Sequence, residues 1–297
     1  MTLVERAIEK LRRAAAAEKT GIAKPVGGLV RDNAPDDGHA AAPNTTPARR
    51  IHIDRVALRE AGYLPEANRD RQFADHYRQI KRPLVERACA PSDPGAANPR
   101  LIVMASALPG DGKTFTSINL ALSLATERDI SVVLVDADLP KPHVSRIFGV
   151  DKEPGLLEAL SDPNIDVESL LLPTDIGSLS ILPAGDPNEN ATELLASARM
   201  ASIVARLLGR NPRRIILFDS PPLLVSSESH ALASIAGQVV LVVKSGSTAR
   251  HAVLDALAEL GPDKNVSLVL NQGRVAVGGY YGYGGYGSHG DAAAKPD

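Results

Sequence analysis

Six short runs of apolar residues recur over the last two thirds of the chain, separated by segments of helical length. The runs are LIVMAS, SVVLVD, LSILPA, RIILFD, QVVLVVK and SLVLN. Because successive positions within a run are apolar, both of its faces must be buried, as in a mainly parallel sheet covered by helices on both sides. The pattern predicts one doubly wound α/β domain over residues 100–272.

The part of the chain before this domain has a different pattern. Leu3, Val4, Ala7, Ile8 and Leu11 recur at helical spacing, which predicts an amphipathic helix within residues 1–19 that docks on a membrane or on a protein. Residues 20–50 are rich in Gly, Pro, Ala, Asn and Asp, which is typical of a flexible linker. We expect residues 51–99 to be a helical lead-in, and residues 273–297 to be a disordered tail.

The segment ALPGDGKT follows the first apolar run directly and opens a helical segment. It matches a relaxed phosphate-loop pattern, in which glycines let backbone N–H groups point at phosphate oxygens and the helix adds its positive end. Lys113 is expected to reach the β- and γ-phosphates of a nucleotide, and Thr114 to bind Mg²⁺. A simple glycine turn is the alternative. The predicted nucleotide-binding residues are Pro109, Gly110, Asp111, Gly112, Lys113, Thr114 and Phe115.

Three aspartates follow later apolar runs. Asp136 and Asp138 come after the second run, and Asp219 ends the fourth. Since ligands of open α/β sheets bind at the carboxyl ends of the strands, we expect all three carboxylates near the phosphate loop. Each alone is as well explained as a helix cap. Together they suggest that one supports Mg²⁺ and another accepts a proton from an attacking hydroxyl.

A glycine-rich tail holds four of the six tyrosines of a chain with 3% aromatic residues: Tyr280, Tyr281, Tyr283 and Tyr286. The last apolar run ends at Asn271, which faces the adenine base or lies in a turn. The nine residues from there to the first tail tyrosine span roughly 30 Å when extended. The tail tyrosines are therefore within reach of the nucleotide site and are candidate substrates.

Composition excludes several classes of protein. A net charge of −2 argues against a general nucleic-acid binder. The single cysteine excludes an internal disulfide framework. The sequence contains no apolar stretch of about 20 residues, so it predicts no membrane span. We expect a cytoplasmic protein.

The segments ALPGDGKT, VLVDADLPKP and ILFDSPPLL, together with the tyrosine tail, resemble the bacterial tyrosine kinase family over residues 75–290. The layout is most similar to the exosortase-associated tyrosine autokinases. The resemblance implies a protein-tyrosine kinase that uses ATP and Mg²⁺, phosphorylates its own tail, and regulates exopolysaccharide synthesis or export. By motif, Asp136 would lie nearest the incoming tyrosine, while Asp138 and Asp219 would organise the metal with Thr114.

The resemblance also implies partners. They are other copies of the chain in a ring, a separate membrane polysaccharide co-polymerase that recruits the kinase to the plasma membrane, and a tyrosine phosphatase. The family's subunit-contact spacing of Glu, Arg and Arg corresponds here to Asp75, Arg78 and Lys81. After Asp138 the family commonly has Leu-Arg, whereas this chain has Leu-Pro followed by Lys141. Whether transfer occurs within or between subunits stays open.

Two other functions fit parts of the pattern. A partitioning or septum-positioning ATPase shares the fold and the strand-end aspartates, but it carries a second lysine where this chain has Leu108, and it needs no tyrosine tail. A non-catalytic, nucleotide-dependent assembly module would use the Gly/Tyr tail only as an interaction segment. Transfer of phosphate to the tail separates these alternatives from a kinase.

Overall fold

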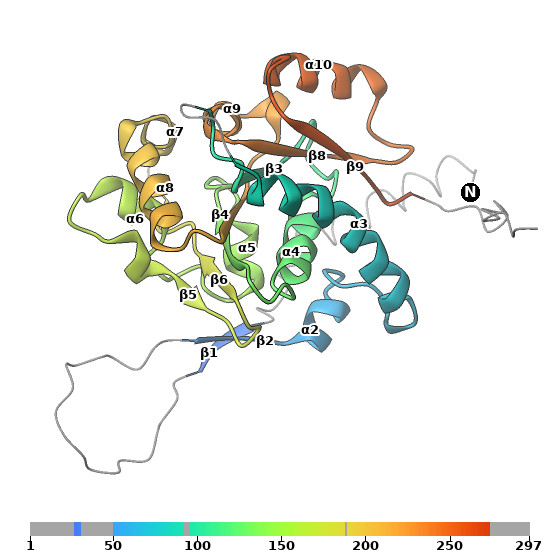
Figure 1. Cartoon of the computed structure of the whole chain (residues 1–297), viewed down its shortest axis with the longest axis horizontal. Coiled ribbons are helices and arrows are strands. Elements are labelled where there is room, and N and C mark those ends of the chain that lie inside the picture. The colour runs from blue at the N-terminus through green and yellow to red at the C-terminus, as the bar shows by residue number, and fades with distance from the viewer. Residues whose placement is uncertain (1–26, 31–49, 92–95, 188, 274–297) are drawn as a thin grey trace, which may run out of the picture.

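The computed structural model describes residues 27–30, 50–91, 96–187 and 189–273. Its main element is a seven-stranded sheet of order β5-β6-β4-β7-β3-β8-β9, in which all neighbouring strands are parallel except β5 and β6 (Figure 1). The strands are β3 (Leu101–Ser106), β4 (Ser131–Asp136), β5 (Leu172–Pro173), β6 (Leu179–Leu182), β7 (Arg214–Asp219), β8 (Gln238–Lys244) and β9 (Val266–Asn271).

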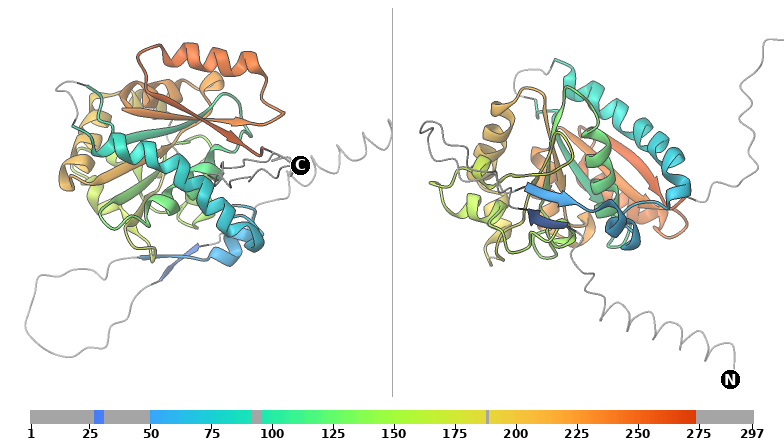
Figure 2. Two further views of the ribbon diagram at one scale, coloured as in Figure 1. Left: turned by 45° about the vertical axis from the view of Figure 1, so that its right-hand side comes forward. Right: turned by 90° about the horizontal axis from the view of Figure 1, so that it is seen from below.

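Helices cover both faces of this sheet (Figures 1 and 2). One face carries α2 (Arg55–Glu60), α3 (Asp70–Cys89), α4 (Lys113–Leu124) and α5 (His143–Ile147). The other carries α6 (Leu156–Ser161), α7 (Ala191–Leu195), α8 (Ala198–Arg210), α9 (Ser227–Ile235) and α10 (Arg250–Leu260). Short 3₁₀ turns lie at η1 (Ala67–Arg69), η2 (Val167–Leu170) and η3 (Leu223–Val225).

The central strand β3 explains why the apolar runs are continuous. All six of its residues are buried. Leu101 and Val103 face the core under α6 to α10, whereas Ile102 and Met104 face the core under α3 and α4. Each side of the strand thus needs apolar residues, and the predicted doubly wound, mainly parallel sheet is confirmed.

A two-stranded antiparallel hairpin of β1 (Gly27–Val30) and β2 (Arg50–Ile53) lies beside the β5 edge (Figure 1). Residues 27–30 and Arg50, which composition placed in a linker, are strand residues instead. Ile51 and Ile53 are buried while Arg50 and His52 are exposed, the alternation of a strand with one covered face. Local composition did not indicate this pairing, because each strand has four residues and its partner lies far along the chain.

The remaining N-terminal expectation and the tail fall outside the described residues. The predicted helix within residues 1–19 lies in the undescribed residues 1–26, and all four tail tyrosines lie in residues 274–297. None of the helices in the described ranges has the length and apolar character needed to cross a membrane.

Candidate functional site

The phosphate-loop segment connects β3 to α4 at the carboxyl edge of the sheet. Gly110 and Gly112 have φ angles of 84° and 90°, a region that favours glycine. A Cβ atom at Gly112 would lie 1.9 Å from Nδ2 of Asn271, so a larger residue would displace the Asn271 side chain as well as strain the backbone. The loop therefore places its backbone at the N-terminal end of a 12-residue helix, where N–H groups and the helix dipole favour an anion.

Lys113 and Thr114, the first two residues of α4, both contact Asp219 at the end of β7. Nζ of Lys113 lies 3.0 Å from Oδ1 of Asp219, and the Thr114 hydroxyl donates to Oδ2 at 2.8 Å. The buried Ser117 hydroxyl donates to Oδ1 at 2.8 Å. Asp219 is fully buried, and both of its oxygens are paired.

Asp136 ends β4 directly beside Asp219, because β4 and β7 pair in parallel with these two residues in register. Its Oδ2 accepts hydrogen bonds from the backbone N–H and the hydroxyl of Ser145, both at 2.7 Å. No hydrogen-bond partner reaches Oδ1 of Asp136 among the described residues. Asp138 lies two residues further, with Oδ2 3.7 Å from Nζ of Lys113. The structure thus brings the phosphate loop and all three aspartates together.

Burial changes the proton affinity of two of these carboxyl groups. Burial, reinforced by the neighbouring Asp219, raises the pKa of Asp136 to about 7, and the hydrogen bonds from Ser145 oppose this shift. Burial also raises the pKa of Asp138, against the lowering effect of Lys113. A carboxyl group with a pKa near 7 is suited to proton transfer at neutral pH.

Two predicted nucleotide-binding side chains make other contacts. The Phe115 ring packs edge-on against Phe73 of α3, with ring centroids 5.7 Å apart. The Asn271 amide donates to the carbonyl oxygen of Asp111 at 3.0 Å, so it holds the loop in this structure. The sequence did not indicate either contact, because each joins residues far apart along the chain.

The site also contains functional positions that the sequence analysis missed. Ser117 and Ser145 are buried hydroxyls that orient Asp219 and Asp136. His143, which the sequence suggested was an ordinary surface or helix residue, is half-buried, and burial lowers its pKa against the raising effect of Asp138. The position of Ser117 four residues after Lys113, one turn along the same helix, was the one available signal.

The donor set fits a magnesium ion bound together with a nucleotide. No group of three or more His, Cys, Asp or Glu side chains within the described ranges would hold a metal ion by itself. Mg²⁺ instead combines one or two carboxylates with phosphate oxygens and waters. The Thr114 hydroxyl, Asp138 and Asp219 would hold it here, with Oδ1 of Asp136 as a further unpaired oxygen.

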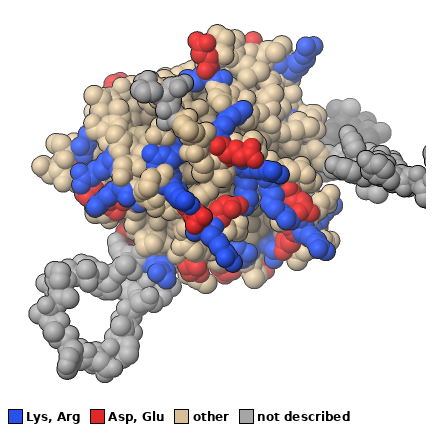
Figure 3. Space-filling model, in the orientation of Figure 1, with Lys and Arg blue, Asp and Glu red and all other residues tan. Residues whose placement is uncertain are grey.

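The residues predicted at a subunit contact divide into two groups on α3. Asp75 and Arg78 are exposed and form an ion pair with each other. Lys81 is buried: Nζ donates to Ser123 O at 2.8 Å and lies 2.7 Å from Oε1 of Glu127, which ties α3 to the end of α4. Its side chain is thus engaged by residues of the same chain, whereas those of Asp75 and Arg78 are on the surface. On the face shown in Figure 3, positive and negative side chains are interspersed.

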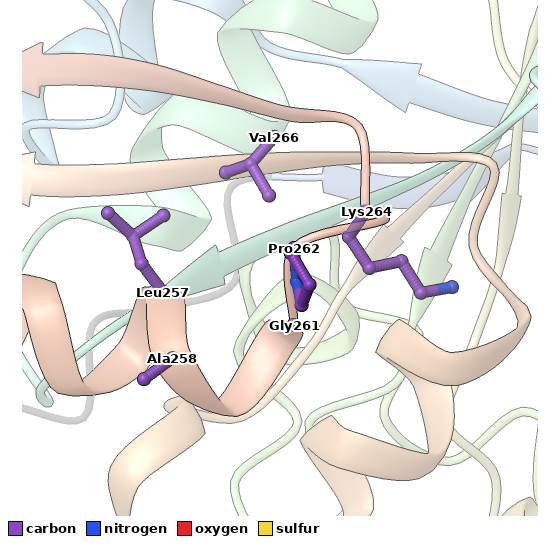
Figure 4. A pocket seen from close by; sticks show the side chains of 6 residues that line it. All are labelled: Leu257, Ala258, Gly261, Pro262, Lys264 and Val266. Atoms are coloured by element: carbon purple, nitrogen blue, oxygen red, sulfur yellow. The ribbon is translucent and has the colours of Figure 1, made fainter.

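A surface pocket of about 450 Å³ lies at the opposite end of the sheet, between the end of α10 and the start of β9 (Figure 4). Its walls include Leu257, Pro262 and Val266. Lys264 at its rim donates to the carbonyls of Ser234 and Ala236. The lining residues supply no acid, base or nucleophile with a free polar group, so we assign the chemistry to the phosphate-loop edge.

The fold and the loop define a class of protein. The AAA domain family matches residues 99–262, which is more than half of the chain. The chain therefore belongs to the AAA domain family. The match ends within the segment between α10 and β9, and it includes the loop and all three aspartates.

The relatives narrow the class. The chain is 30% identical over 186 residues to the tyrosine-protein kinase YwqD of Bacillus subtilis, which is 61% of this chain and 77% of that protein. It is 29% identical over 153 residues to the tyrosine-protein kinase ptk of Acinetobacter johnsonii, and 32% identical over 164 residues to EpsB of Ralstonia solanacearum. The chain covers 20% and 21% of those two proteins. It belongs to the bacterial tyrosine kinase family.

Solved structures agree with this assignment. The kinase domain of VpsO superposes with a TM-score of 0.57 at 27% identity, covering 70% of this chain and all of that one. The BceF tyrosine kinase domain superposes with a TM-score of 0.56 at 30% identity, covering 66% of this chain and 76% of that one. The kinase domain of the Escherichia coli tyrosine kinase ETK superposes with a TM-score of 0.51 at 26% identity, covering 62% of this chain and 72% of that one.

Proposed function

We propose that this chain is an ATP-dependent protein-tyrosine autokinase that phosphorylates Tyr280, Tyr281, Tyr283 and Tyr286 of its tail. The observation that carries the proposal is the meeting of three features at one sheet edge: the phosphate loop, three strand-end aspartates, and the end of β9. The amide of Asn271, the last residue of β9, is bonded to the loop, so the chain leading to the tail begins at the site.

In this proposal the chain's own groups have distinct roles. Lys113 and the backbone N–H groups of the loop bind the phosphates of ATP. Thr114, Asp138 and Asp219 would hold Mg²⁺, which would supply positive charge beside the phosphate oxygens. The tyrosine oxygen bonds to the γ-phosphorus as the bond from that phosphorus to the β–γ bridging oxygen breaks, which releases ADP.

Asp136 is the proposed acceptor of the tyrosine proton. Its unpaired Oδ1 and a pKa of about 7 support this role, because a tyrosine hydroxyl with an ordinary pKa near 10 needs a base at neutral pH. Asp138 is the alternative acceptor, since its side chain is 10% exposed whereas Asp136 is fully buried. The Asn variants of the two residues, compared at constant nucleotide concentration, separate these roles.

We further propose that phosphorylation of the tail regulates exopolysaccharide synthesis through a homo-oligomeric ring, at the inner face of the plasma membrane. A membrane polysaccharide co-polymerase would recruit the kinase, and a tyrosine phosphatase would reverse the modification. Support comes from the family to which the chain belongs. Each phosphate adds about −1.5 to −2 charges, so a modified tail would be repelled by the aspartates of the site.

Phosphotyrosine mapping by mass spectrometry tests the function. Phosphatase-treated protein is incubated with Mg-ATP, alone and with candidate co-polymerase segments, beside a Lys113→Met control. We expect phosphate on the tail tyrosines that is absent from the control. ATP hydrolysis with an unmodified tail under both conditions would reject the kinase and favour the partition-type ATPase. Nucleotide binding with neither reaction would favour the assembly module.

A mixing experiment determines where transfer occurs. Lys113→Met protein with an intact tail is the acceptor, and protein with all four tail tyrosines changed to Phe is the donor. Phosphate on the acceptor tail demonstrates transfer between subunits. Phosphorylation of the unmixed wild type, together with an unmodified acceptor in the mixture, demonstrates transfer within one subunit.

A further inference from the structure

The carboxylate of Asp111 is turned into the protein, although this residue lies within the phosphate loop. It is 4% exposed. Oδ2 accepts from the backbone N–H of Leu108 at 3.2 Å, and Oδ1 accepts from the hydroxyl of Thr248 at 2.6 Å. A carboxylate that faced bound phosphates would repel them. The Asp111 carboxylate instead joins two residues within the loop and connects the loop to the segment after β8.

Thr248 is prepared for this contact by the end of β8. The backbone N–H of Lys244 donates to the Thr248 hydroxyl oxygen at 3.0 Å, and the N–H of Thr248 donates to the Lys244 carbonyl at 3.1 Å. With its oxygen accepting from the strand, the hydroxyl is oriented to donate to Asp111. The contact is thus held at both ends, and the acceptor is charged, which strengthens the hydrogen bond.

Asn271 holds the same loop residue from β9. Its amide donates to the Asp111 carbonyl at 3.0 Å, while its own backbone carbonyl accepts from Ser245 at 2.9 Å. The amide nitrogen lies against the Cα of Gly112, where a side chain would clash. The segment after β8 thus presents one donor to the side chain of Asp111, and the end of β9 presents another to its backbone carbonyl. Both lie on the side of the loop opposite β7 and Asp219.

We propose that Thr248 and Asn271 are positioning residues that hold the phosphate loop in its nucleotide-binding shape through Asp111. The two positive-φ residues of the loop are Gly110 and Gly112, and glycine has many other conformations open to it, so contacts from outside the loop are needed to hold this shape. A loop already in the binding shape pays less ordering entropy when a nucleotide arrives. Lys113 and Thr114 must exchange their contacts with Asp219 for phosphates and Mg²⁺, whereas Thr248 and Asn271 keep theirs. The inference rests on nucleotide binding in the proposed function.

Calorimetric titration with MgADP tests the proposal in the full chain without requiring phosphoryl transfer. Thr248→Val removes the hydroxyl at constant shape, and we expect the dissociation constant to rise about tenfold, the effect of losing a hydrogen bond to a charged group. Asn271→Ala should raise it about fivefold. Thr248→Ser keeps the hydroxyl and should retain most of the affinity.

Thr174→Val is the matched control. Thr174 is a buried threonine after β5, at the far edge of the sheet, and its hydroxyl donates to Leu179 O at 3.0 Å. Its loss should lower the unfolding temperature, as Thr248→Val should also do, but leave the affinity for MgADP unchanged. This separates a positioning role from general stabilisation of the fold.

Three outcomes overturn the inference. They are unchanged affinity in both Thr248→Val and Asn271→Ala, an equal loss of affinity in Thr174→Val, and no recovery in Thr248→Ser. If Thr248→Val does not fold, the affinity of Asn271→Ala alone tests the proposal, since Asn271 is only half-buried. Failure of the wild type to bind MgADP is a different result, because it removes the proposed function itself.

Discussion

The ends of β7 and β4 lie side by side, and each carries a fully buried aspartate at the same register position. Their surroundings differ. Asp219 on β7 is paired with the Lys113 ammonium and with two hydroxyls. Asp136 on β4 has one oxygen bonded to Ser145 and one oxygen without a partner in the described part of the chain.

The difference separates a carboxylate whose two oxygens are both paired from one that has an oxygen left for proton transfer. Both oxygens of Asp219 are already engaged by an ammonium group and by hydroxyl groups, and these are the partners that a metal ion would replace. A buried carboxylate without a cation in direct contact favours its protonated form. Two identical side chains on adjacent strands therefore have different chemistry, because helix α4 supplies Lys113, Thr114 and Ser117 to one of them only.

Asp219→Asn should have the largest effect, because it leaves the Lys113 ammonium buried with Asp138 at 3.7 Å as its nearest remaining anion. Breaking a buried ion pair by removing one partner costs about 3–5 kcal/mol. Urea unfolding without nucleotide measures this loss. Transfer to the tail should fall at least about a hundredfold. A variant as stable as wild type would show that the pair contributes nothing to folding.

Asp136→Asn should slow transfer to the tail about as much as Asp219→Asn does, with a smaller effect on folding. Loss of a general base costs about a hundredfold or more. Folded Asp136 keeps its proton up to a pH of about 7, whereas the unfolded chain releases it near 3.8. The folded state binds more protons between these values, so the stability of the wild type falls as pH rises through this window.

The Asn variant lacks this titration. In urea titrations without metal or nucleotide, the free energy of unfolding of the variant should therefore rise relative to that of the wild type as the pH increases from 5 to 7.5. Parallel pH profiles for the two proteins would contradict the raised pKa. Asp138→Asn, assayed beside it, identifies the acceptor: the residue whose loss removes transfer but spares MgADP binding is the base.

The sequence predicted the parts of this site that have a local pattern. The loop lies between an apolar run and a helix, and each aspartate follows an apolar run, so all four were identified from their neighbours in the chain. Six strands of the sheet were predicted in the same way. β5 was not, because it has two residues, and one of them is Pro173 at an edge position.

The contacts that distinguish the two aspartates have no such pattern. Lys113 and Asp219 are 106 residues apart, and Thr248 and Asp111 are 137 apart. Lys81 fitted the spacing of an interface residue, but its side chain bonds to groups at the end of α4, 42 and 45 residues away. A hydroxyl or ammonium finds its partner through the fold, so its role becomes evident only when the strands and helices are in place.

Ser145→Ala and Ser117→Ala give the smallest expected effects, and they test the same comparison from the donor side. Each serine is buried and donates its hydroxyl to one aspartate. The Ser145 hydroxyl also accepts from the N–H of Ala184 at 3.1 Å, so its removal leaves two buried groups with lost contacts and should cost about 2 kcal/mol. Asp219 keeps Lys113 and Thr114 when Ser117 is changed, and about 1 kcal/mol is expected. Urea unfolding midpoints of the two variants, measured in one buffer at pH 7.5, show which substitution destabilises the fold more. Equal losses, or a larger loss at Ser117, would show that the two strand ends are supported alike.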